Sequence, residues 1–150
     1  MNTDLRDLYQ DVILDHSRRP RNFRVLNAPA RKVDGYNPLC GDRLTLYMDV
    51  QDDVVKDVAF QGSGCAISTA SASVMTEVLR GKSRVEAEAL FDAFHALVTG
   101  KQGAAPPESL GKLAVFAGVS EFPSRVKCAV LAWHTAKAAL EGKEDSISTE

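Results

Sequence analysis

Two runs of alternating hydrophobic and polar residues, separated by a short acidic turn, constrain the fold of this chain most strongly. In the first run every second residue is hydrophobic: Leu44, Leu46, Met48 and Val50. The second run covers residues 54–60, and Gln51-Asp52-Asp53 lie between the two. Because the side chains of a strand point alternately to its two faces, this pattern predicts a β-hairpin with one buried face. Residues 31–36 could form a further short strand.

Helical patterns flank this hairpin on both sides. A first helix is expected from Thr3 or Asp4 to about His16, because its hydrophobic residues fall on one face. After the hairpin we expect helices at 66–79, from 83 to Gly100, at 108–117 and at 124–140, with a linker at 102–107. The pattern indicates an α+β fold: a small antiparallel sheet of about three strands packed against several helices, with an N-terminal helix and a long C-terminal helix.

Length and composition exclude several classes of protein. The 150 residues suit a single domain over 1–150, with a polar tail that we expect to be flexible from about residue 142. A net charge of −2 from 18 basic and 20 acidic residues predicts no nucleic-acid partner. No apolar run of about 18 residues predicts a membrane span. The absence of a signal-like N-terminus and the few cysteines favour a reducing compartment, and we expect the cytoplasm.

The three cysteines, Cys40, Cys65 and Cys128, carry the chemistry of the chain. Their odd number excludes complete internal disulfide pairing. With Asp42 they would supply the four ligands of a tetrahedral metal site, and this mixture of soft sulfur and hard oxygen suits zinc or ferrous iron rather than magnesium or calcium. A single buried cysteine usually acts as a small apolar side chain in the core. The metal site is therefore predicted from the three cysteines taken together and not from any one of them.

The predicted hairpin brings two of these ligands close together. If the turn centres near Asp52, the numbers of paired residues sum to about 104. Cys40 would then lie opposite residue 64, next to Cys65, and Asp42 would pair near Gly62. Slippage of the register by one or two residues would leave these ends adjacent.

The remaining ligand, Cys128, must come from the last helix. If Ser124 is the N-cap, Cys128 occupies the first turn, and Cys65 also begins a helix. At both places the helix dipole should lower the pKa of the thiol. Arg125 and Lys127 are expected to offset the negative charge of the site.

Other interpretations of these residues are weaker. A cysteine–histidine hydrolase built on Cys65 has no histidine placed beside it in the sequence. His16, His95 and His134 show no ligand spacing, and we expect surface or partly satisfied side chains. The glycine-rich turn before residue 65 could hold an anion, but it lacks the lysine and the spacing of a P-loop.

From about Leu8 to Leu140 the chain resembles the U-type iron–sulfur cluster assembly proteins, the family of IscU, SufU and the N-terminal part of NifU. Five segments carry the resemblance: Leu8–His16, Arg19–Phe23, Asn37-Pro38-Leu39-Cys40-Gly41-Asp42, Gly64–Ser73 and Phe122-Pro123-Ser124-Arg125-Val126-Lys127-Cys128. The resemblance implies that Cys40, Asp42, Cys65 and Cys128 are the metal and sulfur ligands.

Two features resemble the SufU branch. Scaffolds of the IscU type usually have a histidine where this chain has Lys127, and a shorter stretch between the second and third cysteines. The resemblance then implies a zinc-bound sulfur acceptor in which Cys40 takes sulfur from the persulfide of a cysteine desulfurase and passes it to downstream iron–sulfur assembly components. Arg125 would neutralise the site or assist docking. Such a protein is a sulfurtransferase-like partner rather than a stand-alone enzyme.

The alternative is a scaffold on which a [2Fe–2S] cluster is assembled and transferred to apo-proteins, with the same cysteines binding iron. A purely structural zinc site is less favoured, since structural sites seldom include an aspartate.

Overall fold

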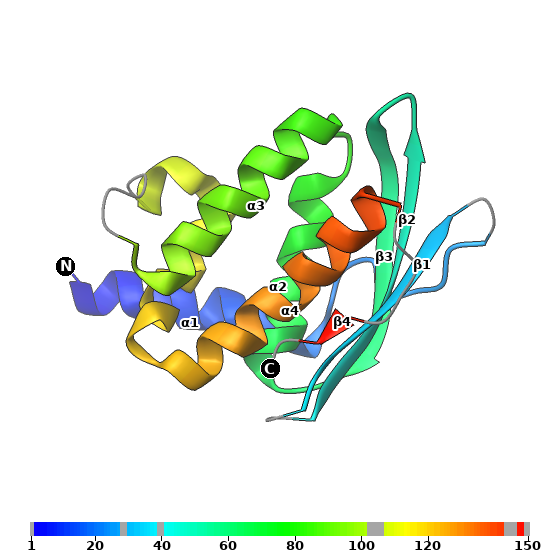
Figure 1. The fold of residues 1–150 in the computed structure, drawn as a ribbon. Helices are drawn as coiled ribbons and strands as arrows, with labels where there is room; N and C mark the ends of the chain where they lie inside the picture. The colour runs from blue at the N-terminus through cyan, green and yellow to red at the C-terminus, as the bar shows by residue number, and fades with distance from the viewer. Residues whose placement is uncertain (1, 28–29, 39–40, 102–106, 143–146, 149–150) are drawn as a thin grey trace.

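The computed structural model has an α+β fold in which helices cover one face of a sheet (Figure 1). It describes residues 2–27, 30–38, 41–101, 107–142 and 147–148. The predicted fold class is confirmed. None of the helices in these ranges is long and apolar enough to cross a membrane.

The sheet contains β1 (Arg31–Asn37), β2 (Asp42–Gln51), β3 (Val54–Ser63) and β4 (Ile147–Ser148), in the order β3-β2-β1-β4. The first three strands are antiparallel neighbours, as the alternating pattern predicts. The two residues of β4 add a parallel pairing to β1. They belong to the polar tail from about residue 142, whose flexibility stays a prediction.

The register of the β2–β3 hairpin differs by two residues from the predicted one. Leu44 pairs with Gly62 rather than with residue 60. Two causes add up. The turn consists of Asp52 and Asp53, both at positive φ, so the pairing is centred after Asp52. An irregularity between Asp49 and Val50 shifts the register once more. Asp42 therefore lies beside residue 64 and not opposite Gly62.

The helices are α1 (Asn2–Arg18), α2 (Ala66–Leu79), α3 (Arg84–Thr99), the 3₁₀ segment η1 (Pro107–Glu121) and α4 (Pro123–Leu140). α1 continues two residues beyond its predicted end at His16. α3 begins at a capping box between Ser83 and Glu86 and ends at Gly100 in the left-handed conformation, where the sequence predicts its limits. Of the predicted linker, residues 102–106 lie outside the described residues.

Two predicted helices begin or wind differently. The expected helix at 108–117 is part of the 3₁₀ segment, which is interrupted at Gly111, where φ is 59° and ψ is −129°. Ser124 does not cap the last helix, because Pro123 occupies its first position and Phe122 is the N-cap. Cys128 consequently lies in the second turn of α4 instead of the first.

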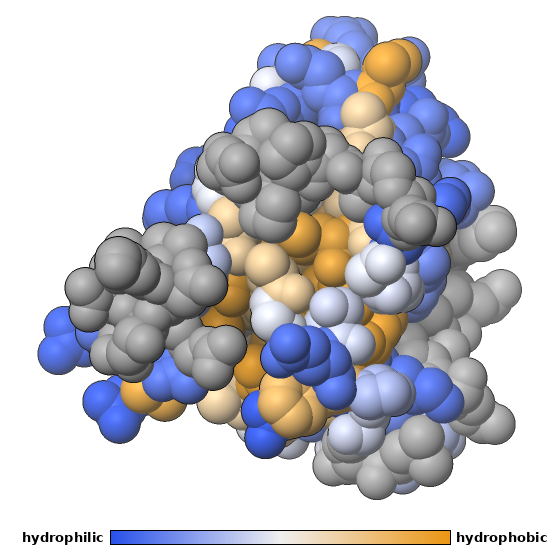
Figure 2. All heavy atoms as spheres, turned by 90° about the vertical axis from the view of Figure 1, so that its left-hand side faces the viewer, coloured by the Kyte–Doolittle hydropathy of each residue, from blue (hydrophilic) through white to orange (hydrophobic). Residues whose placement is uncertain are grey.

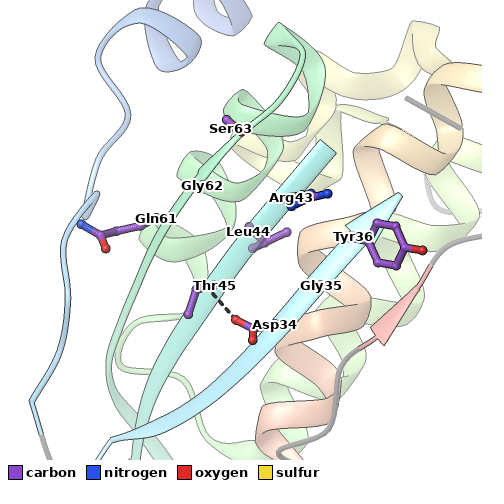
Figure 3. A pocket seen from close by; sticks show the side chains of 9 residues that line it. All are labelled: Asp34, Gly35, Tyr36, Arg43, Leu44, Thr45, Gln61, Gly62 and Ser63. Atoms are coloured by element: carbon purple, nitrogen blue, oxygen red, sulfur yellow. Dashed lines mark hydrogen bonds between the residues drawn. The ribbon is translucent and has the colours of Figure 1, made fainter. Parts of the chain in front are cut away.

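The core lies between the sheet and the helices. The inward side chains of the strands pack on α2 and α4, and an aromatic cluster of Phe94, Phe116 and Trp133 joins α3, η1 and α4. α4 approaches β1 so closely that a Cβ atom on Gly35 would overlap Thr135 Oγ1. A hollow of about 570 Å³ lies along the strands, and its lining includes the polar residues Asp34, Arg43 and Gln61 (Figure 3).

Candidate metal centre

Three of the four predicted ligands meet at one end of the sheet. Asp42 starts β2, Cys65 precedes α2, and Cys128 lies in the second turn of α4. One potential ligand atom from each residue lies within 4.8 Å of the others. The fourth predicted ligand, Cys40, lies outside the described residues. Within the described ranges this is the one group of three or more histidine, cysteine or acidic residues with such spacing.

Asp42 is almost completely buried, with 1% of its surface exposed, and it is oriented by the start of α2. Its Oδ1 accepts a hydrogen bond of 2.8 Å from the backbone N–H of Cys65. Its Oδ2 lies 3.8 Å from the Cys65 sulfur. Gly64 makes this approach possible, because a Cβ atom there would lie 2.6 Å from Asp42 Oδ1. One carboxylate oxygen is thus anchored and the other faces the thiol.

Cys65 is the N-cap of α2, with φ −68° and ψ 167°. Its sulfur accepts a hydrogen bond of 3.4 Å from the backbone N–H of Ser68, and its side chain is exposed. An N-cap position favours a negatively charged side chain, because the first N–H groups of a helix lack partners within the helix. The prediction that Cys65 stands at a helix start is confirmed.

Cys128 has a different environment. It is buried, and its thiol donates to the carbonyl oxygen of Ser124 over 3.7 Å. The side-chain amide of Asn37 donates to the same sulfur over 3.9 Å. The expected first-turn position of Cys128 is wrong, and the effect of a helix dipole falls off within the first turn. A side chain from β1 contacts the sulfur instead.

The donor set fits a zinc or ferrous ion. In tetrahedral zinc sites, metal–sulfur bonds of about 2.3 Å and metal–oxygen bonds of about 2.0 Å place a sulfur and an oxygen ligand roughly 3.5 Å apart. The distance of 3.8 Å between Cys65 Sγ and Asp42 Oδ2 is close to this value. Two thiols with one carboxylate also have the softness that favours zinc or iron over magnesium or calcium.

The two cysteines open into a cavity of about 480 Å³. Its walls are mainly apolar side chains from α1 and α2, including Ile13, Leu14 and Ile67. Among the residues that the structure describes, Arg125 is the one charged residue that lines this cavity, and its guanidinium lies 4.9 Å from the centre of the Phe122 ring. Of the two cations expected near the site, Arg125 therefore lies at the cavity and Lys127 does not line it.

A second cavity, of about 420 Å³, adjoins this one between α1 and η1, and Ile13, Ile67 and Arg125 line both. On the face that carries α1 and η1, hydrophobic side chains gather in a hollow (Figure 2). The two cavities beside the candidate ligands are therefore lined mainly by apolar side chains.

Sequence reasoning missed two polar residues. Asn37 was noted only as part of a motif, although a strand one residue longer would have placed it opposite Asp42. His16 is buried, and its Nδ1 forms a hydrogen bond of 2.7 Å with Ser73 Oγ. His95 and His134 are exposed, as expected. No histidine belongs to the three-residue cluster described above.

The sequence of this chain is similar to those of known proteins. The sequence model of the NifU-like N-terminal domain matches residues 8–129. The iron–sulfur cluster assembly scaffold protein IscU of Streptococcus pyogenes serotype M1 is 44% identical over 91% of this chain and 85% of its own length. The zinc-dependent sulfurtransferase SufU of Bacillus subtilis is 41% identical over 95% of this chain and 96% of its own.

Solved structures with a similar fold also include a NifU-like protein. The crystal structure of the N-terminal part of a nitrogen-fixing NifU-like protein from Brucella abortus superposes with a TM-score of 0.79 at 26% identity, covering 93% of this chain and 98% of that one. The family match spans the hairpin, α2 and the start of α4, which carry the three candidate ligands Asp42, Cys65 and Cys128. The chain therefore belongs to the family of NifU-like N-terminal domains, together with IscU and SufU proteins.

Proposed function

We propose that this member of the iron–sulfur cluster assembly family is a zinc-bound acceptor of sulfur from a cysteine desulfurase. The observation that carries the proposal is the convergence of potential ligand atoms of Asp42, Cys65 and Cys128 within 4.8 Å, where the two cysteines line a mainly apolar cavity. Cys40, two residues before Asp42, completes the proposed ligand set. The name of the Bacillus relative, a zinc-dependent sulfurtransferase, supports the choice of zinc.

Bound zinc would keep the thiols deprotonated and protected from oxidation. In the proposed transfer, the Cys40 thiolate attacks the outer sulfur of the desulfurase persulfide. The bond between the two sulfurs of that persulfide breaks, the desulfurase cysteine leaves as a thiolate, and Cys40 becomes the persulfide. Asp42 would make the bound metal more labile, since a carboxylate is a weaker ligand for a soft metal than a fourth thiolate would be. Arg125 offers a positive charge to the anionic group that enters the cavity.

A second candidate function is assembly of a [2Fe–2S] cluster on the same ligands. The scaffold name of the Streptococcus relative favours it, since that protein is 44% identical to this chain. Lys127 stands where scaffolds of the IscU type usually have a histidine, and this residue favours sulfur transfer.

One experiment separates the two functions. The protein is purified without added metal, its zinc and iron are measured, and sulfide release by a cysteine desulfurase is assayed with and without it. We expect one zinc per chain and a strong acceleration that Cys40→Ala abolishes. A transferable cluster after anaerobic reconstitution, without any acceleration, would establish the scaffold function instead. If the Cys40→Ala variant accelerates sulfide release as strongly as the wild type, Cys40 is not the sulfur acceptor.

A further inference from the structure

Asn37 is a buried amide beside the metal ligands, and the proposed sulfur transfer gives it no role. It is the last residue of β1, and its side chain has no exposed surface. Its Nδ2 donates to Cys128 Sγ over 3.9 Å, from a strand 91 residues away in the sequence. An apolar side chain could fill the same space, so the presence of an amide at this position needs a chemical reason.

The backbone of Asn37 connects it to the second ligand. Asn37 is paired with Asp42, and this pair lies directly before the turn that connects β1 to β2. Its carbonyl oxygen also accepts a hydrogen bond of 2.9 Å from the N–H of Gly41, the residue before Asp42. A shift of Asn37 would therefore move both the amide at Cys128 and the strand that carries Asp42.

An N–H group directed at a thiolate withdraws electron density from the sulfur. Such hydrogen bonds from residues outside the ligand set orient a metal ligand and adjust its donor strength. Cys65 receives an N–H from the backbone of Ser68 at 3.4 Å. Cys128 lies in the second turn of its helix, and the amide of Asn37 supplies the N–H at that sulfur.

We propose that Asn37 is a positioning residue of the metal centre, which holds the Cys128 sulfur in place and moderates its donation to the bound metal. This inference rests on the proposed function, because it requires that Cys128 binds a metal. It assigns the asparagine before Pro38 a chemical role toward Cys128, in addition to its place at the end of the strand.

The test uses cobalt as a spectroscopic substitute for zinc in the full chain. In Asn37→Ala, and in the isosteric Asn37→Asp, the N–H donor to the sulfur is lost. We expect the sulfur-to-cobalt charge-transfer band to move to longer wavelength, because an unmoderated thiolate gives up its electrons more easily. Zinc affinity, measured by competition with a chromophoric chelator, should fall by about 10- to 100-fold.

Asn22→Ala is the matched control. The Asn22 amide donates to Thr76 Oγ1 at 3.0 Å, and its φ of 57° makes alanine unfavourable there, so this variant loses stability without touching the ligands. Wild-type band position and zinc affinity in both Asn37 variants would overturn the inference. Equal loss of affinity in the Asn22 and Asn37 variants, with unchanged bands, would also overturn it. A wild-type chain that binds neither zinc nor cobalt would instead refute the metal site of the proposed function.

Discussion

At the scale of single residues, the candidate site depends on residue 64 being a glycine, which has no Cβ atom. The carboxylate of Asp42 occupies the space that a Cβ atom would need, since such an atom would lie 2.6 Å from Asp42 Oδ1. Asp42 has little room to move, because it is buried and its carboxylate accepts a hydrogen bond from the backbone N–H of Cys65. We predict that Gly64→Ala displaces the carboxylate and lowers zinc affinity by about 10- to 100-fold, measured by chelator competition.

The same substitution should destabilise the metal-free protein by about 1–3 kcal/mol, because it adds a methyl group to a filled site. Gly118→Ala is the control, since a Cβ atom at Gly118 would meet no atom within 4 Å. Wild-type zinc affinity in Gly64→Ala would show that the position of the Asp42 carboxylate does not matter for binding.

At the scale of elements, a buried histidine joins α1 to α2. His16 Nδ1 forms a hydrogen bond with Ser73 Oγ, and its Nε2 lies 3.7 Å from Glu77 Oε1. Burial lowers the pKa of His16 below its ordinary value of 6.5, and the positive charge of Arg21 adds to this effect. The folded protein therefore holds this imidazole neutral where the unfolded chain would already be protonated.

We predict that the free energy of unfolding decreases as the pH falls below about 6.5, because His16 then binds a proton in the unfolded chain but not in the folded chain. The loss continues down to the lowered pKa of the folded state, with a slope of at most about 1.4 kcal/mol per pH unit. Urea unfolding of wild type and His16→Gln between pH 5 and 8 measures it. The pKa of His134 is also lowered, by partial desolvation of its ring and by the nearby charges of His95 and Lys137, so the variant should lose only part of the slope. Identical slopes would exclude His16 as a source.

The elements also show which structural features the sequence could predict. Helical periodicity and glycine or serine caps placed α2 and α3 almost to the residue, and alternation placed the strands of the β2–β3 hairpin to within three residues, because these signals are local. The register of the hairpin could not be predicted, since it depends on the two positive φ values at Asp52 and Asp53 and on an irregularity farther along the strands. The start of α4 was missed because Ser124 looked like a cap, whereas Pro123 already occupies the first helical position.

The candidate site was predictable to a similar extent. Residue type and the hairpin together indicated that Asp42 and Cys65 would be neighbours, and the register error of two residues left them at the same end. The contact between Asn37 and Cys128 could not be predicted, because it depends on how α4 packs across β1. Packing between distant segments leaves no periodic pattern in the sequence.

At the scale of the whole molecule, the candidate ligands come from three elements that are far apart in the chain. β2, α2 and α4 each contribute side chains to the common core, and their N-terminal parts bring the candidate ligands together at one end of the sheet. A metal ion bound there would connect the first residue of β2, the N-cap of α2 and the second turn of α4. Such an ion binds only the folded chain, so its binding free energy adds to the stability of the fold.

We therefore predict that zinc raises the thermal stability of the entire domain. With free zinc at about 1,000 times its dissociation constant, the stabilisation is about 4 kcal/mol. For a chain of this size each kcal/mol corresponds to roughly 2–4 °C, so the midpoint of unfolding should rise by about 8–16 °C. Calorimetry of the chelator-treated and zinc-loaded protein measures the shift. Cys65→Ser is the control, because its hydroxyl can still cap α2 but is a poor zinc ligand. An equal shift in this variant would mean that zinc acts elsewhere on the chain.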